Sequence, residues 1–191
     1  GVNGVNSLRI AFNYGDKNMV KKLLDLGADP NYTDSLGISQ LMWVSGVSHT
    51  NRDVVDIEYV RLLLQYGANV APVNRGGISA LDYAAKAGET EIFDLLLEYG
   101  GAVSKKTFPL VWKQRDSVTY FGIVNRVAKE SLSADIALDI DPILEAAVTG
   151  DTVKTKTLVQ QDGLNESNAD LVLHYTAAFG TAETLELIWA K

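Results

Sequence analysis

The chain has 191 residues, 47% of them hydrophobic, which is enough for a sizeable core and typical of a folded protein rather than a disordered one. It has no cysteine, which excludes disulfides, thiolate metal sites and thiol nucleophiles. The formal net charge of −7 argues against general nucleic-acid binding, and we expect no membrane span because no window has the unbroken apolar length of one.

The first predicted unit, residues 5–33, consists of two helices. Its marker residues are Leu8, Ala11, Gly15, Val20, Leu23, Leu24 and Gly27. Ser7 precedes the first leucine, where a hydroxyl can cap exposed helix N–H groups. Gly15 and Gly27 fall where the two helices end, because glycine adopts the left-handed C-cap conformation without steric cost. The stretch LLDLGADPN (23–31) is therefore interpreted as a helix end and a turn, not as a ligand loop.

The second and third predicted units, residues 34–73 and 74–104, repeat this pattern. Their helix ends read LLQYGANVA (63–71) and LLEYGGAVS (96–104), and the turns at 34–37 and 74–77 connect successive units. Neither helix of a unit could bury its apolar stripe alone, so the units must stack. The second unit has seven extra residues within 47–56, including His49, which we interpret as a tolerated bulge rather than a site.

Beyond residue 104 the pattern weakens and then returns. Two helices, at 107–115 and 117–130, are predicted for a divergent unit at 105–139. IDPILEAAVTGD (140–151) opens a unit at 140–166, with a helix starting at Asp141-Pro142. VLHYTAAFGTAETLELI (172–188) marks a last unit at 167–191. We therefore expect one elongated domain spanning 1–191.

These units resemble the ankyrin repeat, whose period is about 33 residues. The family's T-P-L-H-x-A-A-x-x-G segment corresponds to SLRIAFNYG (7–15), SQLMWVSG (39–46) and SALDYAAKAG (79–88), although the proline is missing from all three. The resemblance implies an all-α solenoid of about five stacked helix-turn-helix units, with short β-turn or hairpin connections and an irregular central unit. It also implies partner contacts on the concave face and hairpin tips, at Tyr14, Leu36, Ile38, Trp43, Arg75, Ile78 and Lys86. Trp43 has the alternative of lying wholly in the core.

Other residues that could carry chemistry fit structural roles better. His174 holds the family's histidine position, which implies a hydrogen bond that braces a turn. Asp135, Asp139 and Asp141 lack the spacing of a calcium loop. Asn31 lies where the resemblance implies hydroxylation of asparagines, but we favour a role in shaping the turn. Motifs for phosphate binding, hydrolysis or zinc proteolysis are missing, so we expect no catalytic residue, no cofactor and no metal.

Positive charge is concentrated in residues 101–129, which carry six basic residues against Asp116 alone. One interpretation is a helix with solvated lysines whose aromatic residues face the stack. The other is a docking patch at Lys105, Lys106, Lys113 and Arg115 for an acidic peptide, a phosphate group or an anionic lipid.

The sequence thus favours a non-catalytic protein–protein interaction module, monomeric on its own and cytoplasmic, with a nuclear location or delivery into a host cell as alternatives. A second hypothesis is a regulatory or targeting segment of a larger enzyme, channel or secreted effector, because the chain starts at Gly1 without a methionine. A third is that the basic patch binds anionic lipid or nucleic acid. The repeat specifies a scaffold, so partner, organism and pathway do not follow from it.

Overall fold

The computed structural model describes residues 7–47, 56–112, 120–134 and 142–161, together with the single residues 172, 173, 176 and 186. Within these residues the protein is mostly helical, and its only β-structure is a pair of isolated bridges. The chain forms two compact units, Gly1–Ile123 and Val124–Lys191. The prediction of an all-α repeat fold is confirmed.

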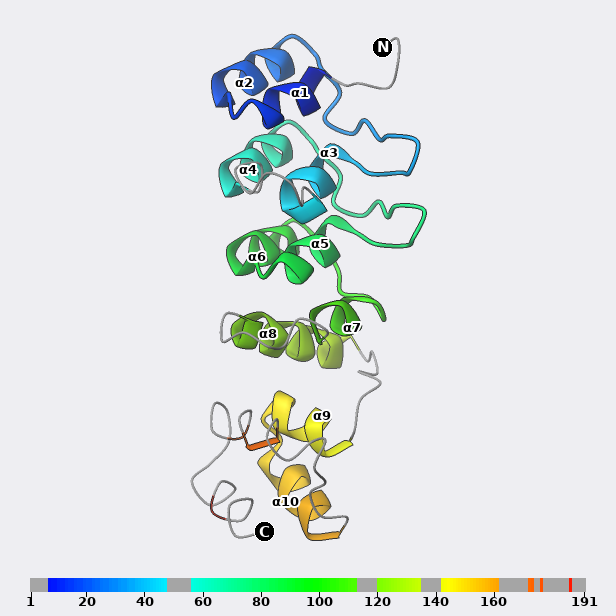
Figure 1. The fold of residues 1–191 in the computed structure, drawn as a ribbon, viewed down its shortest axis with the longest axis vertical. Helices are drawn as coiled ribbons and strands as arrows, with labels where there is room; N and C mark the ends of the chain where they lie inside the picture. The colour runs from blue at the N-terminus through cyan, green and yellow to red at the C-terminus, as the bar shows by residue number, and fades with distance from the viewer. Residues whose placement is uncertain are drawn as a thin grey trace. The chain divides into compact units, whose positions relative to one another are not determined.

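The first unit contains successive helix pairs joined by short turns, with two hairpins that project on the same side (Figure 1). Its helices are α1 (Ser7–Asn13), α2 (Lys17–Asp25), α3 (Gln40–Met42), α4 (Ile57–Gln65), α5 (Ala80–Ala87), α6 (Thr90–Glu98) and α7 (Thr107–Trp112). A π-helical turn, η1 (Trp43–Val47), extends α3. Helix α8 (Tyr120–Ser133) crosses the boundary between the two units. Residues 48–55, which hold most of the extra segment and His49, lie outside the described residues.

Glycines end the helices as the sequence predicts. Gly15 and Gly88 follow the first helices of their pairs and have φ angles of 70° and 78°. Gly27, Gly67 and Gly100 follow the second helices with φ of 86°, 82° and 86°. At the other ends, the hydroxyls of Ser39 and Ser79 accept hydrogen bonds from backbone N–H groups three residues on, each at 3.1 Å. These caps fix where each helix begins and ends, and therefore the length of the connecting hairpins.

The core of the first unit is formed where the apolar stripes of the helices meet. Leu8, Phe12 and Val20 are fully buried. Phe12 packs edge to face on Tyr59 of the next helix pair, with ring centroids 5.1 Å apart and an interplanar angle of 69°. Of the predicted apolar stripe on α2, Val20 and Leu24 are buried, whereas Leu23 is only half-buried.

In the second unit, α9 (Pro142–Thr149) packs against α10 (Thr152–Gln161). The predicted start at Pro142 is confirmed, and Gly150 follows α9 with φ of 74°. The Asp151 carboxylate accepts a hydrogen bond of 2.9 Å from the backbone N–H of Lys154 near the start of α10. His174, Asp135, Asp139 and Asp141 lie outside the described residues, as does nearly all of the predicted last unit.

Candidate protein-binding face

Two hairpins of the same construction separate the first three helix pairs. Each is closed by an antiparallel bridge, Thr33 to Ser39 and Val73 to Ser79. Within the first, the Asp34 carboxylate accepts backbone hydrogen bonds from Leu36 and Ile38 at 2.9 and 3.0 Å. Asn74 has the same role in the second, accepting from Gly76 and Ile78 at 2.8 and 3.0 Å. The side-chain oxygen thus builds the turn in both hairpins.

The tips of the two hairpins are bonded to each other. The backbone N–H of Arg75 donates to the carbonyl oxygen of Leu36 at 3.1 Å. The Leu36 side chain remains 60% exposed at its tip, and Arg75 is also exposed. An exposed leucine and an exposed arginine therefore lie on adjacent tips, which are held in register by the backbone.

The expectation that Ile38 is exposed is wrong. Its side chain is 7% exposed and belongs to the core. Its N–H donates to Asp34, and its carbonyl accepts from the Asp34 N–H at 3.1 Å and from Arg9 at 3.1 Å. These bonds hold Ile38 at the base of the hairpin, where its side chain turns inward. Ile78, the equivalent residue of the second hairpin, is half-buried.

Trp43 lies between two helix pairs rather than wholly in the core. It is half-buried, and the Arg9 guanidinium of α1 lies 4.5 Å from its ring centroid. Arg9 also forms a salt bridge of 2.8 Å with Asp34. Burial opposes ionisation of Asp34, but the hydrogen bonds from Arg9 and from the backbone of Ile38 and Leu36 outweigh it, so the pKa of this carboxyl lies below its ordinary value. The sequence did not indicate that Arg9 pairs with Asp34, because the two residues are 25 positions apart in the chain.

The remaining predicted face residues differ in exposure. Tyr14, which follows α1, is 84% exposed. Lys86 is half-buried on α5. Of the predicted basic patch, Lys105 and Lys106 are exposed, whereas Lys113 and Arg115 lie outside the described residues. In addition to Leu36, five of the predicted face residues are therefore at least partly exposed: Tyr14, Trp43, Arg75, Ile78 and Lys86.

Lys106 occupies the place where a third hairpin would lie. Only residues 101–106 separate Gly100 from α7, too few for another hairpin. The Lys106 ammonium instead donates to the carbonyl oxygen of Gly76, the counterpart of Leu36 in the second hairpin. The Lys106 side chain thus donates to the tip of the second hairpin, as the backbone N–H of Arg75 donates to the tip of the first.

The Asn31 side chain bonds the turn that follows α2 to the turn that follows α4. Its side-chain amide donates to the carbonyl oxygen of Gly67 at 3.0 Å and accepts from the backbone N–H of Asn69 at 2.8 Å. The side chain therefore joins two successive turns. The repeat pattern does not suggest this role, since the position of Asn31 is held by Ala71 in the next copy and Asn69 corresponds to Asp29.

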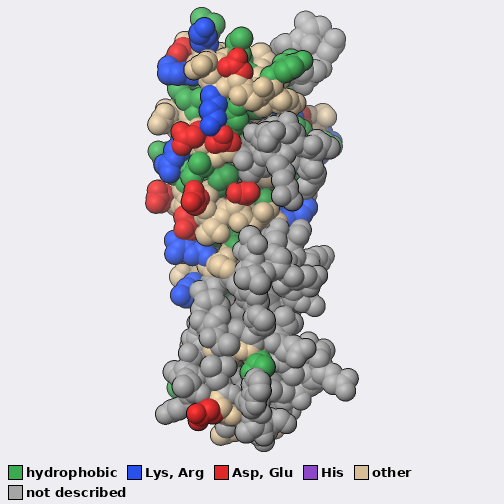
Figure 2. Space-filling view, turned by 60° about the vertical axis from the view of Figure 1, so that its left-hand side comes forward, with side chains coloured by type: hydrophobic (Ala, Val, Ile, Leu, Met, Phe, Trp, Pro, Cys, Tyr) green, Lys and Arg blue, Asp and Glu red, His purple; other side chains and the backbone are tan. Residues whose placement is uncertain are grey.

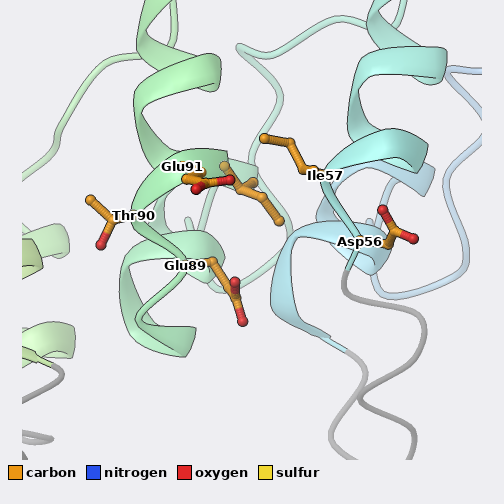
Figure 3. Close-up of a pocket in the computed structure, with 6 residues that line it drawn as sticks. Asp56, Ile57, Glu89, Thr90 and Glu91 are labelled. Carbon is orange, nitrogen blue, oxygen red and sulfur yellow. The ribbon is translucent and has the colours of Figure 1, made fainter.

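The face formed by the second helices is of mixed charge and becomes acidic at α6. Acidic side chains lie on this side of the first unit together with lysines and arginines (Figure 2), and α6 with its N-cap contributes Glu89, Glu91, Asp94 and Glu98. A pocket of about 450 Å³ at the starts of α4 and α6 is lined by Asp56, Ile57, Glu89, Thr90, Glu91 and Ile92 (Figure 3). Among the described residues, no group of three or more His, Cys, Asp or Glu could hold a metal ion, and none of their helices is long and apolar enough to cross a membrane.

Comparison with known proteins agrees with this architecture. The chain is 32% identical over 102 residues to the nuclear factor NF-kappa-B p105 subunit of Gallus gallus, and 35% identical over 98 residues to ankyrin repeat and SOCS box protein 11 of Homo sapiens. These alignments cover 53% and 51% of this chain but only 10% and 28% of the relatives.

Among solved structures, the human ASB11 ankyrin repeat domain matches with a TM-score of 0.56 at 18% identity, over 97% of this chain and 83% of that one, which supports the fold alone. The family model for ankyrin repeats (3 copies) matches residues 6–107, more than half of the chain. The match spans the three helix pairs and the two hairpins described above. The chain therefore belongs to the ankyrin-repeat family.

Proposed function

We propose that this chain binds a partner protein through the hairpin tips and the first-helix face of its first unit, without catalysing a reaction. Ankyrin repeats are in general non-catalytic modules of protein–protein interaction. The observation that carries the proposal is the backbone bond between Arg75 and Leu36. It presents an apolar and a cationic side chain on neighbouring rigid tips.

Rigid presentation matters because binding is weakened by the entropy of ordering a surface. The tips are held by side-chain oxygens within each hairpin and by the backbone between hairpins. Leu36 is 60% exposed although it lies in a turn, where a solvated residue is usually polar. Aromatic and arginine side chains often dominate interface energy, and Tyr14, Trp43 and Arg75 supply them here.

The test compares partner capture by the parent chain and by two double variants. Leu36→Ala with Arg75→Ala removes the proposed tip contacts. Met19→Ala with Lys22→Ala removes exposed side chains of similar type from α2 on the second-helix face. We expect the tip variant alone to lose a specific partner that mass spectrometry identifies, while both variants keep the parent's circular dichroism. Equal capture by the parent and both variants would place the interface elsewhere.

A further inference from the structure

Within the second hairpin, α5 and the segment that leads into α7, the charged side chains that reach the surface are all basic. Residues 68–88 and 101–112 contain four basic residues, Arg75, Lys86, Lys105 and Lys106, and a single acidic residue, Asp82. Asp82 is 1% exposed. Its carboxylate accepts hydrogen bonds from the backbone N–H and hydroxyl of Ser79 and from the Thr107 hydroxyl. The one negative charge is thus enclosed, and the surface around it is basic.

The charge of this basic surface is opposite to the net charge of the whole chain, which is −7. The acidic side chains of the same helix pair other than Asp82 belong to α6 and its N-cap, on the second-helix side. The first unit therefore presents opposite charge on its two sides at the level of α5 and α6. A partner of either charge would be attracted to one side and repelled by the other.

The bond from Lys106 to Gly76 places one cation at the tip of the second hairpin, at the residue that follows Arg75 in the chain. Lys105, which precedes Lys106 in the chain, is exposed. We call Arg75, Lys105 and Lys106 the basic tip cluster. Within the described part of the chain, neither Arg75 nor Lys105 forms a salt bridge. The exposed Leu36 lies on the adjoining tip.

We propose that the segment bound by this face is an acidic stretch of polypeptide, with carboxylates at the basic tip cluster and an apolar side chain against Leu36. This inference rests on the proposed function and adds the chemistry of the partner. Arginine can bind a carboxylate through two parallel hydrogen bonds, and the lysines add attraction at longer range. The opposite charge of α6 repels the same segment from the second-helix side at the level of α6.

The experiment selects binders from a library of random short peptides displayed on phage, using the immobilised parent chain. The affinity of each selected peptide is then measured by fluorescence anisotropy. Two charge-reversal variants with the same change in net charge are compared: Arg75→Glu with Lys105→Glu, and Lys22→Glu with Arg61→Glu on the second-helix side. Lys106 is kept in both because it bonds the hairpin tip, and circular dichroism checks that both variants fold.

We expect the selected peptides to be enriched in aspartate and glutamate. Reversal at Arg75 and Lys105 then weakens their binding by about tenfold or more, whereas the matched control changes it by less than about twofold. Peptides without acidic enrichment would overturn the inference, as would acidic peptides that bind both variants alike. The same holds if phosphatidylserine vesicles or single-stranded DNA bind as tightly as the best peptide, since the surface would then recognise anionic surfaces in general.

Failure of the inference can be told apart from failure of the proposed function. Suppose the selected peptides are neutral, and Leu36→Ala weakens their binding while the charge reversals do not. The proposal of an acidic segment would then be wrong, and the proposed binding face would still hold. A selection that yields no peptide, or peptides insensitive to Leu36→Ala and to both reversals, would count against the binding face as well.

Discussion

The backbone N–H of Arg75 donates to the carbonyl oxygen of Leu36 at 3.1 Å, so that the tip of one hairpin is fixed to the tip of the next. One unit further on, the hairpin is missing, and the Lys106 ammonium bonds the equivalent carbonyl oxygen of Gly76. In the described segment 101–106, a lysine side chain therefore makes the bond that a backbone N–H of the next hairpin would make.

Lys106→Ala tests this role. The bond is exposed, so we expect the free energy of unfolding to fall by less than about 1 kcal/mol. Hydrogen exchange followed by mass spectrometry is expected to become faster in residues 73–79 and to stay unchanged in residues 33–39. Lys105→Ala is the control, and equal acceleration in both variants would contradict the role of Lys106.

Asn31→Ala tests the bond between successive turns. The change removes two hydrogen bonds, to Gly67 and from Asn69, and leaves both backbone groups without this partner. We expect a loss of about 1–2 kcal/mol in urea unfolding followed by circular dichroism. Asn18→Ala on the exposed surface of α2 is the control, with a change within about 0.5 kcal/mol. A loss no greater than this in Asn31→Ala would mean that the bridge adds nothing to stability.

Gly46 is predicted to tolerate no side chain. Its φ is 138°, and an added Cβ would lie 2.7 Å from the Tyr83 carbonyl oxygen and 2.9 Å from the Ala87 Cβ. We expect Gly46→Ala to destabilise the protein by about 2–3 kcal/mol or more, through backbone strain and overpacking against α5.

Gly122→Ala is the matched control. A Cβ there would meet nothing within 4 Å, and the residue lies in the first turn of α8. Alanine in place of glycine is expected to stabilise the helix there by about 0.5 kcal/mol or less. Thermal unfolding of the two variants therefore shifts in opposite directions if the packing of Gly46 is as described. A destabilisation of similar size in both would contradict it.

Asp34 makes stability depend on acid pH. Its pKa in the folded protein lies below the ordinary value of 3.8, so its contribution is complete above that value and is lost as pH falls through the folded pKa. We expect Asp34→Asn, which copies Asn74 of the second hairpin, to flatten the decline in unfolding free energy at pH values below about 3.8. A decline with the parent's steepness would show that other carboxylates account for it.

Local signals in the sequence predicted the helix ends and hairpin turns, because glycines, serine caps and a fixed spacing depend on neighbouring residues. They did not predict that Ile38 is buried, since its orientation depends on hydrogen bonds with Arg9 of the first repeat and Asp34 of the second. They also did not predict the early end of α3. Gly46 follows Leu41 by five residues, whereas Gly15 and Gly88 follow their leucines by seven, and a π-helical turn accommodates the difference.

The candidate face was predicted in part. Tyr14, Leu36 and Arg75 are exposed as expected, because hairpin tips and helix ends lie on the surface in any such repeat. The role of Lys106 escaped prediction, since its partner Gly76 lies 30 residues earlier in the chain. Charge counting indicated a basic patch, but the enclosure of Asp82, which leaves that surface without an exposed acid, required the structure.

Hydrogen exchange of the chain, free and bound to a peptide or partner selected as above, tests directly whether the partner binds the hairpin tips and the first helices. We expect protection on binding in residues 33–39, in residues 73–79 and in α5, with α2, α4 and α6 unchanged. Protection confined to α2, α4 and α6 would contradict it, because the partner would then lie on the second-helix side.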